Sequence, residues 1–226
     1  MQTIRGVLLD VDGSLVDSND AHARAWVEAL AEHGVEVPVE KVRPLIGMGG
    51  DKLLPKVSGL REDSPEGKKV SKRRQEIFKE RYLPALGPTP GATDLLNHIR
   101  ERGLKMVVAS SAKADELNGL LRVCGADLLI HAQTSSEEAE NSKPDPDIVH
   151  AALEKIALPA PEVVLLGDTP YDVEAGNRAG VRVIAVRCGG WGDKDMAGAA
   201  AVYDDPADLL AHFDASPLSP AKASGG

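Results

Sequence analysis

Two aspartates one residue apart, Asp10 and Asp12, follow an apolar run near the start of the chain. Side chains of an extended segment alternate in direction, so these two carboxylates project to the same side. Carboxylates held that close raise each other's pKa unless a cation or strong hydrogen-bond donors offset their charges. The pair therefore indicates either a polar turn, in which Gly13 supplies an unusual backbone angle, or a site that contains a metal ion or a lysine.

Two later apolar runs are also followed by polar side chains. Ser110 and Ser111 follow one run, Asp168 and Asp172 follow the other, and Lys143 lies in a loop stiffened by two prolines. In a parallel sheet ligands bind beyond the carboxyl ends of the strands, so these residues are expected to meet at one edge. Their types suit an anion together with a metal ion.

Each of these residues also has a purely structural interpretation. Ser110 can cap the next helix, and Thr169 with Asp172 fits a capping box at a helix start. Lys143 can be an ordinary solvated lysine. A helix start does not explain Asp168, which therefore favours the interpretation as a site.

The apolar runs alternate with amphipathic segments, which predicts an α/β fold with a doubly wound, mainly parallel sheet covered by helices on both faces. Strands are expected at 7–9, 105–109, 128–130, 163–166, 181–186 and 200–203. Helices are expected at 19–33, 39–46, 51–57, 64–86, 92–102, 114–123, 146–156, 171–179 and 206–213, with Ser18 as the cap of the first.

The order of these elements predicts two structural units in the 226 residues. Residues 1–17 and 88–214 are expected to form the α/β core, and residues 18–87, which contain no apolar strand, an all-helical insert. Residues 215–226 are rich in Pro, Ser, Gly and Ala and are expected to be a disordered tail.

Composition excludes several classes of function. A net charge of −9 and an aromatic share of 3% argue against nucleic-acid binding. No apolar run is long enough to cross a bilayer, so no membrane association is expected. Two cysteines and no secretory segment at the N-terminus predict a cytoplasmic location. The oligomeric state is left open, and a monomer is compatible with the sequence.

Four segments together resemble a known family. DVDGSLVDS, VVASS, SKPDPDI and LLGDTPYDVEAGNRAG occur in the order of the four motifs of the haloacid dehalogenase-like (HAD) hydrolase superfamily, in its phosphatase and beta-phosphoglucomutase-like branch. The resemblance covers residues 6 to about 186 and implies a Rossmann-like core. It also implies that the helical insert is the cap that these proteins place between the first two motifs.

The resemblance implies a role for each aspartate. Asp10 is expected to be the nucleophile that forms an aspartyl-phosphate, and Asp12 the general acid and then the general base. Mg²⁺ is expected to be held by Asp10, the backbone carbonyl of Asp12, Asp168 and Asp172, the last directly or through an intervening group. These are the hard oxygen ligands that Mg²⁺ prefers.

The resemblance also implies contacts to the phosphate and to the rest of the substrate. Ser110 and Lys143 are expected to act in catalysis by binding the transferring oxygens. The full set of expected substrate or phosphate contacts is Gly13, His22, Gly49, Lys52, Ser110, Ser111 and Lys143. Two departures from the family pattern are Ser14 in place of threonine and Ser111 in place of asparagine.

These features predict a Mg²⁺-dependent phosphoric monoester hydrolase that acts on a small phosphorylated metabolite. Dehalogenases of the family lack the second aspartate, because a halide leaves without an acid, so Asp12 favours a phosphatase. A phosphosugar mutase of the beta-phosphoglucomutase type is the alternative, although residues 47–52 lack the arginine motif of those mutases. A phospho-aspartate signalling module without turnover is disfavoured by the motif order and by the cap.

Overall fold

The apolar runs of the chain form one six-stranded sheet in the order β3-β2-β1-β4-β5-β6, in which every neighbouring pair is parallel. The structure is a computed structural model that describes residues 3–219. The strands are β1 (Gly6–Leu9), β2 (Lys105–Ala109), β3 (Ala132–Thr134), β4 (Val163–Gly167), β5 (Arg182–Val186) and β6 (Ala201–Tyr203). The predicted doubly wound, mainly parallel α/β fold is confirmed.

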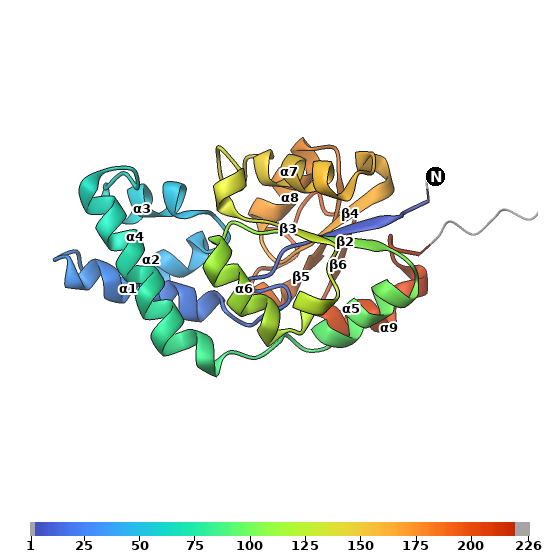
Figure 1. The fold of residues 1–226 in the computed structure, drawn as a ribbon, viewed down its shortest axis with the longest axis horizontal. Helices are drawn as coiled ribbons and strands as arrows, with labels where there is room; N and C mark the ends of the chain where they lie inside the picture. The colour runs from blue at the N-terminus through green and yellow to red at the C-terminus, as the bar shows by residue number, and fades with distance from the viewer. Residues whose placement is uncertain (1–2, 220–226) are drawn as a thin grey trace, which may run out of the picture.

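Strand β1 lies at the centre of the sheet and is buried on both faces. Val7 and Leu9 pack into one hydrophobic core, whereas Leu8 packs into a second core on the opposite face. Full burial of one such side chain contributes roughly 1.5–3 kcal/mol relative to exposure. One face is covered by α5 (Ala92–Glu101), α6 (Ala114–Val123) and α9 (Pro206–Ala211), and the other by α7 (Asp147–Ile156) and α8 (Pro170–Arg178) (Figure 1).

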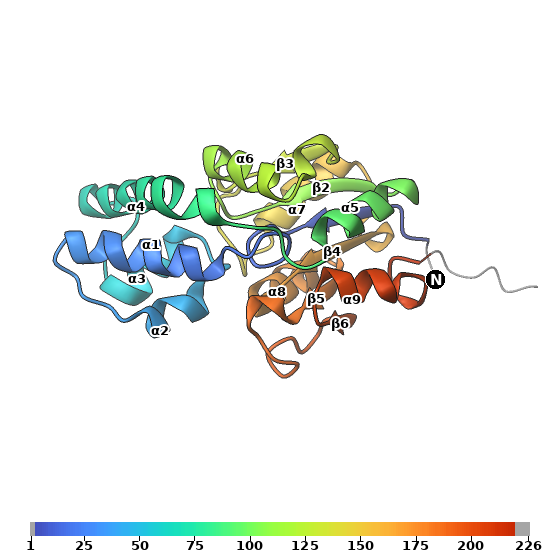
Figure 2. The ribbon, with the colours of Figure 1, turned by 90° about the horizontal axis from the view of Figure 1, so that it is seen from below.

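The helical cap lies beyond the carboxyl ends of the strands, at the opposite end of the sheet from the N-terminus (Figures 1 and 2). Its helices are α1 (Asn19–Glu32), α2 (Val39–Val42), α3 (Gly50–Ser58) and α4 (Pro65–Ile77). All four fall within residues 18–87, and α1 packs against α4. The boundaries at 17/18 and 87/88 stay a prediction.

The chain enters and leaves the cap through two adjacent segments, which we call the hinge ribbon (residues 14–17 and 87–89). Val16 bridges to Pro88, and the Asp17 N–H donates to the Gly87 carbonyl at 3.1 Å. The Thr89 hydroxyl donates to the Ser14 carbonyl at 2.7 Å. The two connections are therefore tied together by hydrogen bonds rather than crossing the gap independently.

The predicted strand at 128–130 is wrong. Ala126–Leu128 is a short 3-10 helix, Leu128 is 87% exposed, and the edge strand β3 begins at Ala132. The predicted helix 64–86 is divided, because α4 ends at Ile77 and the chain continues in a π-helical turn and a 3-10 turn.

The expectation of a disordered tail is wrong for its first residues, 215–219. Ser216 and Leu218 are buried, since Leu218 packs into the core that α5 and α9 cover. Residues 220–226 lie outside the described residues. Within the described part of the chain, no helix combines the length and the apolar character needed to cross a membrane.

Candidate active site

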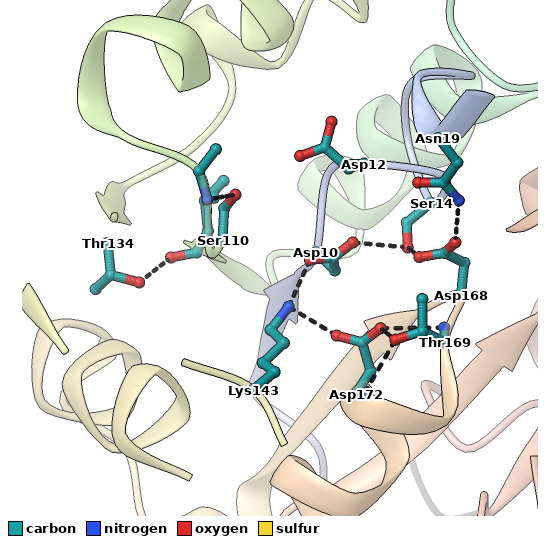
Figure 3. A network of polar contacts seen from close by, with 12 residues as sticks. Asp10, Asp12, Ser14, Asn19, Ser110, Thr134, Lys143, Asp168, Thr169 and Asp172 are labelled. Carbon is teal, nitrogen blue, oxygen red and sulfur yellow. Dashed lines mark hydrogen bonds and ion pairs between the residues drawn. The ribbon is translucent and has the colours of Figure 1, made fainter. Parts of the chain in front are cut away.

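Three buried carboxylates and one buried lysine meet at the carboxyl ends of β1 and β4 (Figure 3). Asp10, Asp168 and Asp172 each offer an oxygen that lies within 4.8 Å of the other two. Lys143 Nζ lies 2.5 Å from Asp10 Oδ1 and 2.7 Å from Asp172 Oδ1. The lysine side chain is 1% exposed, so it is not the solvated loop residue of the structural interpretation.

Two residues after β1 hold this cluster in place. Ser14 Oγ lies 3.3 Å from Asp10 Oδ2 and 3.2 Å from Asp168 Oδ1. Asn19 Nδ2 donates to Asp168 Oδ2 at 2.7 Å. The sequence contains a signal for Ser14, whose hydroxyl matches the threonine of the family motif. It contains none for Asn19, because its partner lies 149 residues further along the chain.

Gly13 makes room for this network. Its φ is +76°, and a Cβ there would lie 2.1 Å from both Asp168 Oδ2 and Asn19 Nδ2. Its N–H donates to the Val16 carbonyl at 2.8 Å within the turn. The turn and the site are therefore the same feature, and the expected contact between Gly13 and the phosphate stays a prediction.

Asp172 serves two purposes with its two oxygens. Oδ2 accepts from the Thr169 N–H at 3.1 Å and from its hydroxyl at 2.6 Å, which completes the predicted capping box. Oδ1 faces Lys143. The helix cap thus orients the carboxylate toward the cluster, and the structural and functional interpretations of this residue hold together.

The electrostatics of the cluster fit a bound cation. Burial, with the charges of Asp172 and Asp12 adding to it and that of Lys143 opposing it, raises the pKa of Asp10. Burial and the charge of Asp10 raise the pKa of Asp168 well above 3.8. One ammonium cannot balance three carboxylates, and hard carboxylate oxygens at this spacing suit Mg²⁺.

Asp12 lies on the other side of Asp10, toward the cap. Its Oδ1 accepts from Ser18 Oγ at 2.5 Å and is 2.6 Å from His22 Nε2. Burial raises the pKa of Asp12, but interaction with His22 and the hydrogen bond from Ser18 outweigh burial and lower it. Ser18 occupies the predicted N-cap position of α1, but its side chain makes no capping hydrogen bond because its hydroxyl donates to Asp12.

His22 lies against Asp12, whereas it was expected to contact the substrate. Its ring stacks on Phe78 with centroids 3.9 Å apart, and its Nδ1 is 3.9 Å from Glu116 Oε1. Glu116 accepts from Arg74 of α4 at 2.7 and 2.9 Å. Sequence reasoning missed this pair of buried Glu116 and part-buried Arg74, since the basic run at 68–74 that contains Arg74 is typical of a solvated helix face.

The two serines after β2 differ in their surroundings. Ser110 is buried, and its Oγ accepts from the Ala112 N–H at 3.0 Å, so it does not cap α6. Ser111 Oγ is buried and, among the described residues, has no hydrogen-bond partner. Ser111 lines a cavity of about 50 Å³ together with Asp10 and Asp12, where its hydroxyl is available to a ligand.

A larger cleft of about 960 Å³ lies between the cap and the core. It shares Gly49, Arg74 and Ser111 with the small cavity. Its walls come from both units: Lys68 and Ser71 belong to the cap, and other lining residues follow β2 and β3. The cleft therefore adjoins the small cavity that Asp10 and Asp12 line.

The segment from Gly47 to Gly50 in the cap contacts the core as well as the two cavities. A Cβ on Gly47 would lie 2.7 Å from Thr169 Cγ2, and one on Gly49 would lie 2.5 Å from Ser142 Cβ. Lys52, expected to contact the substrate, is paired with Asp145 and donates to the Ser142 carbonyl at 2.5 Å. Lys52 therefore contacts the core, and its expected contact with the substrate stays a prediction.

The chain belongs to the haloacid dehalogenase-like hydrolases, whose family model matches residues 7–186. It is 36% identical to Protein SUPPRESSOR OF QUENCHING 1, chloroplastic, of Arabidopsis thaliana, in a match that covers 81% of this chain but 18% of that protein. It is 26% identical to the N-acetylmuramic acid 6-phosphate phosphatase of Pseudomonas aeruginosa, with 93% and 95% covered. The crystal structure of a hydrolase from Pseudomonas syringae superposes with a TM-score of 0.87 at 29% identity, covering 95% and 99% of the two chains.

Proposed function

We propose that this chain is a Mg²⁺-dependent phosphatase that hydrolyses a small phosphorylated metabolite through an aspartyl-phosphate on Asp10. The observation that carries the proposal is the convergence of Asp10, Asp168, Asp172 and Lys143 at one strand edge, with Asp12 beside them. Membership of a hydrolase family and similarity to a protein named as a sugar-phosphate phosphatase support it.

In the first step an Asp10 carboxylate oxygen attacks phosphorus while the bond from phosphorus to the ester oxygen breaks. Lys143 offsets negative charge on the transferring oxygens, and Ser110 and Ser111 contact those oxygens. Asp12 donates a proton to the leaving oxygen. The anionic phosphate beside Asp12 raises the pKa that His22 and Ser18 lower, which favours the protonated form at this stage.

In the second step a water molecule attacks the phosphorus of the aspartyl-phosphate. Asp12, now ionised, accepts the proton of that water, and the Asp10 carboxylate leaves with release of inorganic phosphate. Ser18 and His22 hold Asp12 in one orientation through both steps. Mg²⁺, when held by Asp10, Asp168 and Asp172, neutralises charge on the phosphate and keeps these buried carboxylates ionised.

The test is phosphate release from a panel of phosphorylated metabolites, each assayed with Mg²⁺ and with a chelator. We expect sustained turnover with Mg²⁺, loss of turnover with the chelator and recovery when Mg²⁺ is added back. Activity that survives chelation would contradict the metal assignment. The same panel assayed for isomerisation distinguishes hydrolysis from a mutase, and a single burst without turnover would contradict both.

A further inference from the structure

The first turn of α3 is hydrogen-bonded to the loop that carries Lys143, which we call the lysine loop (residues 142–145). The Gly49 N–H donates to Ser142 Oγ at 3.1 Å, and the Ser142 N–H donates to Asp51 Oδ2 at 3.4 Å. Lys52 Nζ donates to the Ser142 carbonyl at 2.5 Å. Three groups of the cap, from Gly49, Asp51 and Lys52, therefore contact the residue directly before Lys143.

The other end of the lysine loop is held as well. Asp145 Oδ2 pairs with Lys52 from the cap, and its Oδ1 lies 2.8 Å from Arg178 of α8 in the core. Arg178 also donates to the Pro144 carbonyl at 3.2 Å. Lys52 is thus bonded on both sides of Lys143, through the carbonyl before it and the carboxylate two residues after it.

The close approach of the two units explains the glycine at position 49. Its φ is −74°, a value open to every residue type, so the turn itself does not require glycine. A Cβ there would lie 2.5 Å from Ser142 Cβ and 2.8 Å from Ser142 Oγ. Glycine is needed at this position because the cap packs directly on the lysine loop.

We infer that Lys52 is a positioning residue for Lys143, so that docking of the cap sets the position of the ammonium group beside Asp10. The role given to Lys143 rests on the proposed function. An ion pair as exposed as that of Lys52 with Asp145, at 23% and 30% side-chain exposure, contributes little to stability. Because the contacts of Lys52 flank Lys143, whose side chain is 1% exposed, they act instead on the position of that side chain.

The first experiment compares Lys52→Met with Lys56→Met. Lys56 is one turn further along α3, is exposed and lies against Met48 Sδ in the cap, so it is a matched control for loss of a charge. We expect kcat for Lys52→Met to fall roughly tenfold, within the loss of about a hundredfold that a 1 Å misplacement can cause. The factor is expected to be the same for every substrate, whereas Lys56→Met retains the wild-type kcat.

Two further variants separate positioning from a failure to fold. Lys52→Arg keeps a donor to both acceptors and is expected to recover part of the lost activity. Asp145→Asn weakens the contact of Lys52 with the lysine loop from the core side. It is expected to lower kcat by the same factor for every substrate. The Tm of each variant shows whether the protein remains folded.

The second experiment needs no substrate. An amine-reactive reagent followed by mass spectrometry measures the labelling rate of Lys143, which is buried in the wild type. We expect labelling to rise at least severalfold in Lys52→Met and to stay at the wild-type rate in Lys56→Met. Because labelling requires no turnover, it tests whether Lys52 holds Lys143 in place even if the protein releases no phosphate from any ester.

Two results would overturn the inference. One is a Lys52→Met protein with the labelling rate and kcat of Lys56→Met. The other is a rise in KM that differs between substrates while Lys143 labelling is unchanged, since this would show that Lys52 contacts the substrate directly.

Discussion

Asp10 and Asp12 are separated by one residue, yet their surroundings shift their pKa values in opposite directions. Asp10 faces the core, and burial with the charges of Asp172 and Asp12 raises its pKa against the effect of Lys143. Asp12 faces the cap, where His22 and Ser18 overcome burial and lower its pKa. The chain thus places a carboxylate that needs a cation beside one that is already supplied with hydrogen-bond donors.

The difference shows that the two acidic groups depend on different parts of the molecule. The partners of Asp10 come from the core and from the hinge ribbon, and they include the proposed Mg²⁺ ligands. The partners of Asp12 come from the first helix of the cap, which is backed by the pair of Arg74 with Glu116. Variants on the two sides should therefore fail in different ways.

Asp10→Asn is expected to have the largest effect. The amide removes the nucleophile but keeps the size of the side chain, so phosphate release should fall by roughly 10³-fold or more. The loss should be equal for aryl and alkyl phosphates. Near-normal phosphate release from a folded Asp10→Asn protein would show that the nucleophile is another residue.

Asp12→Asn should show a loss that depends on the leaving group. An alkyl phosphate needs a proton on its leaving oxygen, so its hydrolysis should fall by roughly 10²–10⁴-fold, whereas an aryl phosphate with an acidic phenol should lose less. The measurement is kcat/KM for a matched aryl and alkyl pair. An equal loss for both esters would remove the distinction drawn between the two aspartates.

The smallest of the expected effects is a change in the Tm of Asp168→Asn. The sign of this change depends on whether Mg²⁺ is present. The folded-state pKa of Asp168 is raised above 3.8, so its contribution to stability is present at low pH and is lost as the pH rises through that folded value. Without metal, Asp168→Asn should therefore raise Tm, and the rise should be larger at pH 8 than at pH 4.5. Each kcal/mol gained in the free energy of unfolding corresponds to a rise of about 2–4 °C. Asn19 Oδ1, unpartnered among the described residues, can accept from the new amide.

Saturating Mg²⁺ provides the matching control. It should stabilise the wild type by about 2.7 kcal/mol at a concentration 100 times Kd. The rise in Tm should vanish in Asp168→Asn and persist in Asp12→Asn, whose proposed contact uses the backbone carbonyl. Equal responses to Mg²⁺ in both variants would argue against Asp168 as a ligand.

The sequence was sufficient to predict the central strands and the clustering of the aspartates. Continuous apolar runs such as 163–166 form fully buried strands, and the parallel sheet then brings their carboxyl ends together. The prediction failed at the sheet edge, where the three residues of β3, AQT, include two half-buried ones and carry no run of apolar side chains. The nearby apolar residues 128–130 carry a strand-like pattern, although Leu128 is exposed.

Contacts between the cap and the core could not be predicted from the sequence. Lys52 was expected to contact an anionic substrate, but a lysine gives no indication of which acceptor it will meet, and Asp145 lies 93 residues away. The predicted contact between His22 and the substrate stays a prediction. The contact of His22 with Asp12 has no signal in the sequence, because the two residues are ten positions apart and meet only through the turn after β1.

The hinge ribbon has a consequence for how this architecture can be altered. Because Asp17 and Gly87 are hydrogen-bonded neighbours, the chain between them is an insertion whose two ends lie side by side. A turn of a few residues could span that distance in its place, and helical segments of quite different length could be grafted there without moving the strands. The same scaffold could in this way acquire a new substrate range by exchange of one module, while its reacting groups stay where they are.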